Sequence, residues 1–76
     1  MAGTVELYVA PGCPFCAEAR EDLEWRGIAF EEFDVERDPE ARERMLRLTG
    51  GSRTVPVVVQ AGKPVRIGWQ GRGCSI

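Results

Sequence analysis

Two cysteines separated by two residues are the part of this sequence best suited to chemistry. Cys13 and Cys16 lie between an alternating apolar segment, Val5–Val9, and a segment of helical character that begins at Pro14. The first turn of a helix offers free N–H groups and the positive end of the helix dipole, which favour a thiolate at Cys13. The thiolate is the form that attacks disulfides. Because the second thiol lies one turn later, we predict a thiol–disulfide redox site in which Cys13 attacks and Cys16 resolves the mixed disulfide.

Length and composition indicate one small globular domain. We expect it to cover residues 1–76, with a glycine-rich tail over residues 69–76. The hydrophobic fraction of 43% argues against disorder. No apolar run reaches the roughly 20 residues of a membrane span, and residues 1–6 lack the features of a secretory signal, so we expect a cytoplasmic protein. In that compartment the three cysteines favour catalysis, redox exchange or metal binding over a structural disulfide framework.

Charge is unevenly distributed along the chain. The first 43 residues carry all 12 acidic residues and four arginines, whereas the remainder carries six basic residues and no acid. This pattern fits an ordinary solvated surface, and it equally fits a basic face that recognises an anionic ligand or an acidic partner. The net charge of −2 and the absence of a basic run argue against a nucleic-acid partner.

Hydrophobic periodicity and turn residues predict four strands and two helices. The expected strands cover residues 5–9, 28–35, 55–60 and 64–68, and the expected helices cover residues 14–26 and 39–49. Both helices begin with a proline that follows a residue suited to the N-cap, Cys13 in one and Asp38 in the other. The order βαβαββ predicts an α/β fold with a right-handed βαβ start and a final antiparallel hairpin.

Each predicted helix has an apolar face that we expect to point toward the sheet. The expected inward residues are Cys16, Ala19 and Leu23 in the first helix and Ala41, Met45 and Leu48 in the second. Trp25 falls outside this stripe, so we expect it to be partly exposed.

With the motifs placed, residues 4–71 resemble a glutaredoxin or a glutaredoxin-like redoxin of the thioredoxin superfamily. Three segments carry the resemblance: Cys-Pro-Phe-Cys at residues 13–16, Thr-Val-Pro at residues 54–56 and Gly-Trp-Gln-Gly at residues 68–71. The resemblance implies a compact thioredoxin-like fold with a mixed four-stranded sheet, in which the C-terminal third helix of the family is missing or shortened. It also implies a dithiol–disulfide oxidoreductase that reduces protein or low-molecular-weight disulfides.

The resemblance also implies roles for individual residues. Pro56 is expected to follow a cis peptide bond beside the reactive thiol, and the Val55 backbone to bind a substrate peptide or glutathione. No tightly bound cofactor and no metal ligands are implied, and the reductant is expected to be glutathione or a donor of the thioredoxin-reductase type. The expected substrate-binding set is Pro14, Phe15, Arg53, Thr54, Val55, Pro56, Gly68 and Trp69.

Two departures from the common glutaredoxin pattern affect the expected partners. Ala10 stands where many members have a lysine, and no acid follows Glu43 where many have one after the fourth strand. These departures weigh against the usual glutathione contacts, although Arg53 and Arg72 could bind its carboxylates. The Trp-x-Gly pattern at residues 69–71 is closer to redoxins that feed ribonucleotide reductase and are reduced by thioredoxin reductase.

The expected partners are therefore a disulfide-containing protein substrate or glutathione, together with a reductase, and neither nucleic acid nor a membrane. A weak homodimer is a further possibility, because the sheet face left uncovered by the missing helix could be covered either by the tail or by another subunit. We further expect the cationic residues Arg53, Arg66 and Arg72 to cluster on the active-site side.

Two other classes of function compete with the oxidoreductase. A metal or iron–sulfur module would use Cys13 and Cys16 as two of the usual four ligands, with Cys74 or a second chain supplying others. A non-catalytic binding module with a redox-regulated surface is the other alternative. The presence of Pro14 in the motif argues against a cluster, and turnover of a disulfide would exclude the binding module.

Cys74 is an additional thiol that the Cys-x-x-Cys motif does not include. It lies between Gly73 and Ser75 in a segment that we expect to be flexible, so its thiol should be accessible. One interpretation is an incidental cysteine. The other is an accessory thiol that reaches Cys13, or that links two chains, when the protein is oxidised.

Overall fold

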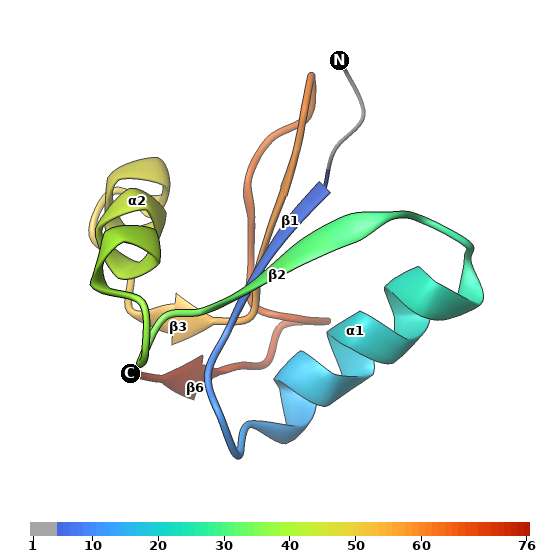
Figure 1. Cartoon of the computed structure of the whole chain (residues 1–76), viewed down its shortest axis with the longest axis horizontal. Helices are drawn as coiled ribbons and strands as arrows, with labels where there is room; N and C mark the ends of the chain where they lie inside the picture. Colours follow the sequence, from blue (N-terminus) through green and yellow to red (C-terminus); the bar gives the residue numbers. More distant parts are fainter. Residues whose placement is uncertain (1–4) are drawn as a thin grey trace.

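The computed structural model describes residues 5–76, so the expectations that fall on residues 1–4 lie outside the described residues. The elements are β1 (Val5–Val9), α1 (Pro14–Trp25), β2 (Phe30–Asp34), α2 (Pro39–Thr49), β3 (Thr54–Val55), β4 (Val57–Gln60), β5 (Arg66–Ile67) and β6 (Cys74–Ser75) (Figure 1). Within this range neither helix has the length and apolar character that a membrane crossing requires.

The main sheet has four strands in the order β2-β1-β4-β5. β1 is parallel to β2 and antiparallel to β4, and β4 is antiparallel to β5. This arrangement confirms the predicted mixed sheet. The strands β2 and β5 are shorter than the expected 28–35 and 64–68, and after β5 the described chain forms a turn and β6 where the family has a third helix.

The strand expected over residues 55–60 is divided at Pro56. The Val55–Pro56 peptide bond is cis, as the resemblance implied. A proline has no N–H to donate to a strand ladder. The chain therefore forms β3 before Pro56 and β4 after it, and β3 pairs with β6 in a second, two-stranded sheet.

The two helices cover opposite faces of the main sheet (Figure 1). Arg20 of α1 makes an ion pair of 2.8 Å with Glu32 of β2, which lies beside Leu7 in the parallel register. Arg44 of α2 reaches Glu6, at 3.8 Å, on the other face. Because side chains alternate along a strand, Glu6 and Leu7 point to opposite faces of the sheet. Helix α2 therefore covers the face of Glu6, and α1 covers the face of Leu7.

Stacked side chains seal the face beneath α2. The rings of Tyr8 and Phe33 are 5.2 Å apart, and the Arg44 guanidinium carbon lies 5.0 Å from the Phe33 ring centre. The Tyr8 hydroxyl donates a hydrogen bond of 2.8 Å to Glu6. Burial, reinforced by the hydrogen bond to Glu6 and its charge, raises the pKa of Tyr8 to about 12.

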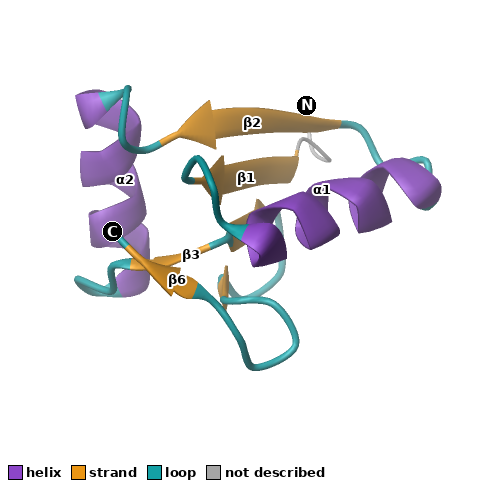
Figure 2. Cartoon of the chain, turned by 90° about the horizontal axis from the view of Figure 1, so that it is seen from below, coloured by secondary structure: helices purple, strands orange, loops and turns teal. Residues whose placement is uncertain are grey.

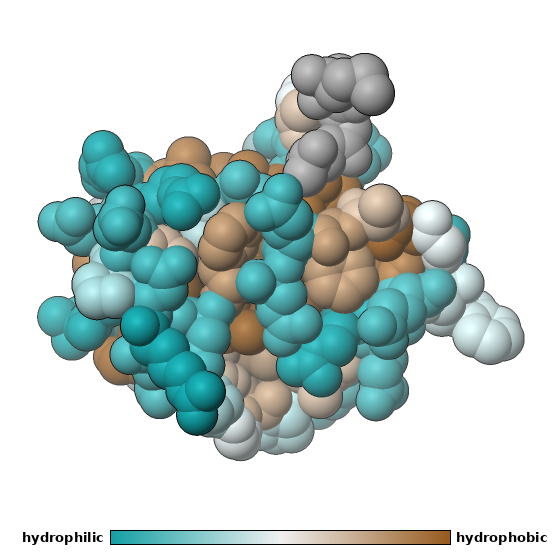
Figure 3. All heavy atoms as spheres, in the orientation of Figure 1, coloured by the Kyte–Doolittle hydropathy of each residue, from teal (hydrophilic) through white to brown (hydrophobic). Residues whose placement is uncertain are grey.

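The start of α2 follows the sequence prediction, but its buried face is rotated. Asp38 accepts hydrogen bonds from the backbone N–H groups of the first turn, and Ala41 and Met45 are buried as expected. Leu48, expected in the core, is 41% exposed. Leu46 is instead the partly buried apolar residue of the last turn, and it packs against the core. Figure 3 shows the resulting surface, where hydrophilic residues cover α2 and hydrophobic atoms show between them over the central strands.

Helix α1 has the inward face that its sequence predicts. Cys16, Ala19 and Leu23 are its buried residues, and Trp25 is 89% exposed. The helix ends before Gly27, which has a φ of +70° that suits glycine after a helix.

Candidate functional site

Cys13 lies at the N-cap of α1, which is the position predicted for the attacking thiol. Its backbone is extended, with φ −89° and ψ 115°, and Pro14 follows at the first helical position. The backbone oxygen of Cys13 accepts hydrogen bonds from Cys16 at 3.2 Å and from Ala17 at 3.4 Å. The Cys13 side chain makes no capping hydrogen bond, and its sulfur lies at the positive end of the helix.

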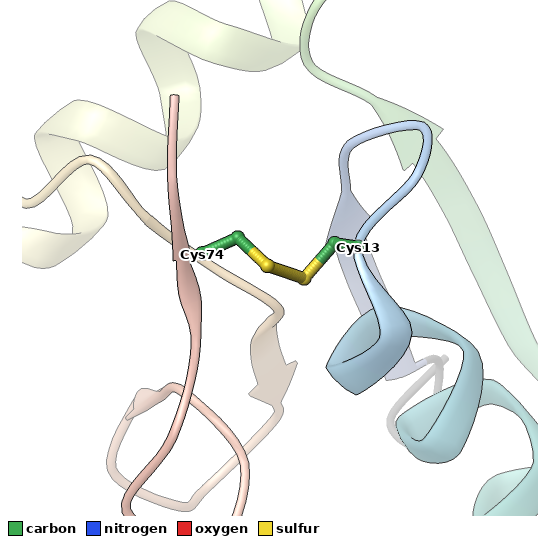
Figure 4. Close-up of a disulfide and its surroundings, with 2 residues drawn as sticks. All are labelled: Cys13 and Cys74. Atoms are coloured by element: carbon green, nitrogen blue, oxygen red, sulfur yellow. A yellow bond between two sulfur atoms is a disulfide. The ribbon is translucent and has the colours of Figure 1, made fainter.

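Cys13 is bonded to Cys74 across 61 residues of sequence (Figure 4). The Cα atoms of the pair are 6.1 Å apart, and Cys16 is the free cysteine. The structure therefore contains one of the oxidised pairings predicted for Cys74. In this state both thiols of the motif are buried, with Cys13 7% exposed and Cys16 2% exposed, and Cys74 is bonded to the Cys13 sulfur.

The Cys16 thiol is shielded in the interior. Burial raises the pKa of this thiol above its ordinary value, and the charge of Glu32 acts in the same direction. A hydrogen bond with the Ala10 backbone and the charge of Arg20 lower the pKa and offset part of this effect. Cys16 is consequently a protonated, weakly nucleophilic thiol at neutral pH.

The tail, residues 69–76, is docked rather than free. Cys74 lies opposite Val55 in the antiparallel β3–β6 pair, and Ser75 lies opposite Thr54. The Ile76 N–H extends the pairing by donating a hydrogen bond of 2.9 Å to the oxygen of Arg53. Figure 2 shows β3 and β6 side by side near the start of α1. The expectation of an accessible Cys74 in a flexible segment is therefore wrong, because strand pairing makes Cys74 half-buried.

Two glycines allow this close docking. A Cβ atom on Gly73 would lie 2.6 Å from the Thr54 methyl carbon and 2.7 Å from the Val55 oxygen. A Cβ atom on Gly68 would lie 2.7 Å from the Arg72 oxygen, and Gly68 also has a φ of +83°. Any larger residue at either position would push the tail away from β3.

A tight turn directs the tail back toward β3. Trp69 and Arg72 exchange backbone hydrogen bonds of 2.6 and 2.9 Å, and the two residues between them, Gln70 and Gly71, have φ values of +52° and +77°. Positive φ at both central positions is the pattern of a two-residue hairpin turn. Trp69 is buried, under the guanidinium of Arg66 at 5.4 Å.

The structure brings together two of the residues that the resemblance singled out, Gly68 and Pro56. The Gly68 N–H donates a hydrogen bond of 2.8 Å to the Pro56 oxygen, which joins the segment after β5 to the end of β3. The half-buried Phe15 packs against the core in the first turn of α1. Trp69 lines a pocket together with Leu23 of α1.

The three arginines that were expected to cluster on the active-site side are placed by different contacts. Arg53, Arg66 and Arg72 are exposed, and within residues 5–76 none of them forms an ion pair. Arg53 adjoins β3, Arg72 closes the hairpin turn and Arg66 covers Trp69. Their clustering around an anionic ligand stays a prediction. In the same part of the chain, no three His, Cys, Asp or Glu side chains are grouped to hold a metal ion.

Sequence reasoning missed β6 and the glycine contacts that hold it. The available signals were the Gln-Gly pair at residues 70–71, which suits a tight turn, and the glycine directly before Cys74. A strand of two residues has no hydrophobic alternation from which it could be predicted.

Comparison with known proteins agrees with this geometry. The glutaredoxin family model matches residues 5–65. A probable glutaredoxin from Synechocystis sp. is 41% identical over 54 residues, and the match covers 71% of this chain and 50% of that protein. Glutaredoxin 3 of Escherichia coli is 33% identical over 54 residues, which cover 71% of this chain and 64% of that protein. The chain thus spans about half to two thirds of the length of these two relatives.

Two solved structures share the fold. The thioredoxin-like protein BC3987 superposes with a TM-score of 0.79 and 41% identity, covering 87% of this chain and 88% of that one. The glutaredoxin-like NrdH-redoxin from Escherichia coli superposes with a TM-score of 0.75 and 33% identity, covering 88% of this chain and 84% of that one. With a family model that covers most of its length and a matching fold, the chain belongs to the glutaredoxin family.

Proposed function

We propose that this glutaredoxin-family chain is a dithiol–disulfide oxidoreductase in which Cys13 is the attacking thiol and Cys16 is a resolving thiol. The observation that carries the proposal is the position of Cys13 at the N-cap of α1, already joined through its sulfur to an extended segment. A sulfur that accommodates one such partner is suited to form a mixed disulfide with another.

The reaction would proceed by two exchanges. The Cys13 thiolate attacks one sulfur of a substrate disulfide, forms a new S–S bond to it and releases the other sulfur as a thiolate, which takes a proton from water. A second thiolate of the chain then attacks Cys13 and releases the remaining substrate thiol. The substrate gains two electrons, and the chain is left with an internal disulfide.

The first turn of α1 would stabilise the Cys13 thiolate in this mechanism. The chain contains no histidine, so no imidazole can act as a base. Pro14 contributes no N–H, which leaves the helix dipole and the N–H groups that follow it as the stabilising elements. We expect the pKa of the reduced Cys13 thiol to fall below that of a free cysteine, which is about 8.5.

The reductant is proposed to be of the thioredoxin-reductase type, with glutathione as the alternative. The structural neighbour from Escherichia coli is described as a glutaredoxin-like protein with a thioredoxin-like activity profile. The sequence Trp69-Gln-Gly71 and the lack of an acid after Glu43 support the same choice. Such a cycle suits a reducing compartment such as the cytoplasm. Reduction of the oxidised chain by thioredoxin reductase with NADPH, compared with reduction by glutathione, distinguishes the two donors.

The test of the proposal is steady-state reduction of a small disulfide by the wild-type chain and by Cys13→Ser. We expect the variant to lose turnover completely, whereas Ser75→Ala, an exposed position in β6, should retain it. Turnover by Cys13→Ser at the wild-type rate would refute Cys13 as the attacking thiol. Absence of turnover in the wild-type chain with either donor would favour the non-catalytic binding module.

A further inference from the structure

We propose that β6 is a built-in substrate strand, which delivers Cys74 to Cys13 as the first resolving thiol, before Cys16 acts. The inference rests on the proposed attack by Cys13 and adds a third thiol to that reaction. It also gives the docked tail a function: the tail competes with external peptides for the edge of β3.

The pairing of β6 with β3 resembles the binding of a peptide. An extended peptide can bind a protein by adding a strand to an exposed edge, so that backbone hydrogen bonds give affinity. Here Cys74 lies opposite Val55, and Ile76 continues the pairing at Arg53. The chain's own residues 74–76 thus occupy the backbone edge beside Pro56 that a substrate segment would need.

The fit of the tail argues for a specific site rather than a chance contact. A Cβ atom on Gly73 would collide with both the Thr54 methyl group and the Val55 backbone oxygen, so only glycine fits there without displacement. The turn between Trp69 and Arg72 sets the direction of the segment before Gly73. These contacts hold Cys74 within bonding distance of Cys13, as Figure 4 shows.

The environments of Cys16 and Cys74 favour Cys74 as the first resolving thiol. Cys16 is almost fully buried, and its raised pKa leaves little thiolate at neutral pH. Cys74 is half-buried on an edge strand, so it is less deeply buried than Cys16, and its sulfur is already within bonding distance of Cys13. An intramolecular thiol held at its target also acts at a high effective concentration.

The proposed sequence of exchanges is balanced in sulfur and in electrons. A substrate disulfide, acting as the oxidant, first forms a mixed disulfide with Cys13 and releases one thiol. The Cys74 thiolate then attacks Cys13, forms the Cys13–Cys74 bond and releases the second thiol. In the last exchange, the Cys16 thiolate attacks Cys13, forms Cys13–Cys16 and releases Cys74 as a thiolate. An external thiol or dithiol reductase finally returns two electrons to Cys13–Cys16.

The relay can be tested by trapping intermediates in three variants of the full chain. Reduced Cys16→Ser, Cys74→Ser and the double variant are mixed with hydroxyethyl disulfide, quenched with acid and weighed by intact-mass spectrometry. In the double variant the mixed disulfide on Cys13 should accumulate. In Cys16→Ser it should decay to Cys13–Cys74 at least about tenfold faster, at a rate independent of protein concentration, because the resolving thiol is intramolecular. In Cys74→Ser its decay should be slower than in Cys16→Ser.

The same experiment separates this inference from the proposed function. If Cys16→Ser retains the mixed disulfide as long as the double variant does, Cys74 does not resolve it and the relay is overturned, while Cys13 remains the attacking thiol. Decay in Cys74→Ser as fast as in Cys16→Ser would also overturn the order of the two thiols. If the double variant never forms the adduct at Cys13, the proposed function itself fails.

Strand delivery is tested with Gly73→Ala in the Cys16→Ser background. The added methyl group collides with the Val55 oxygen and should displace β6, so the mixed disulfide should persist several-fold longer. The matched control is Ser75→Ala, which changes the same strand at an exposed position and should leave the rate unchanged. Far-UV circular dichroism of both reduced variants checks that the fold is retained. An unchanged rate in Gly73→Ala would show that Cys74 resolves without the strand and would overturn its delivery role.

Discussion

The Cys13–Cys74 bond should contribute a large part of the stability of the oxidised chain. The perturbation that isolates it is reduction of the Cys16→Ser variant, in which Cys13 and Cys74 are the two remaining cysteines and can form one intramolecular disulfide. A domain of this size has a small core, so a covalent link carries more weight than it would in a larger protein.

The expected magnitude follows from the length of chain that the bond closes. The two cysteines are 61 residues apart in sequence. A loop of that length removes about 14 cal/mol/K of entropy from the unfolded chain, which is about 4 kcal/mol at 25 °C. For a domain of this size, about 4 kcal/mol corresponds to a rise in melting temperature of roughly 20 °C.

The assay is urea unfolding of Cys16→Ser, followed by far-UV circular dichroism with and without a phosphine reductant. The oxidised form should be more stable by about 4 kcal/mol in its free energy of unfolding. The double variant Cys16→Ser/Cys74→Ser is the control, and the reductant should not change its stability. A difference of less than about 1 kcal/mol between oxidised and reduced Cys16→Ser, with the bond verified by mass, would refute the reasoning.

Two further predictions concern Tyr8 and the arginines near the site. Tyr8 is the one tyrosine of the chain, so phenolate absorbance should show a single titration near pH 12, and Glu6→Gln should lower that midpoint; a midpoint near 10 would contradict the structure. Because the raised pKa favours the neutral phenol in the folded chain, the stability it adds is present below pH 10 and lost as the pH rises toward 12. Charge reversal at Arg53 or Arg72 should slow the reaction with oxidised glutathione more than the reaction with a neutral disulfide, and high salt should reduce this difference. Lys63→Glu serves as the control. Equal effects on both disulfides would indicate an ordinary solvated surface.

Local signals in the sequence predicted the part of the fold that precedes β3. The N-cap of α2 is an example: Asp38 followed by proline predicts a helix start, and the structure has Asp38 bonded to the Glu40 and Ala41 N–H groups. The position of Cys13 at the N-cap of α1 was predictable in the same way, because a proline follows it directly. Such features depend on neighbouring residues, so one sequence is sufficient to find them.

Features that depend on distant contacts were not predictable in the same way. Leu48 fits the spacing of a buried stripe, but in the folded chain Leu46 packs against the core and Leu48 is 41% exposed. The sequence left several cysteine pairings open, because no local pattern links residue 74 to residue 13. In the structure the Cys13–Cys74 pairing goes with the close approach of Gly73 to Thr54 and Val55, which are distant from it in the sequence.

The burial of Trp69 gives the chain a built-in optical reporter of its tail. The sequence contains two tryptophans: Trp25 is 89% exposed, whereas Trp69 is 6% exposed and its backbone pairs with Arg72 at the start of the segment that carries Cys74. Release of the tail would change the surroundings of the buried Trp69 indole more than those of Trp25, which is already mostly exposed. Substitution of Trp25 with phenylalanine would leave Trp69 as the one tryptophan, whose emission on selective excitation follows docking and undocking of the tail in real time.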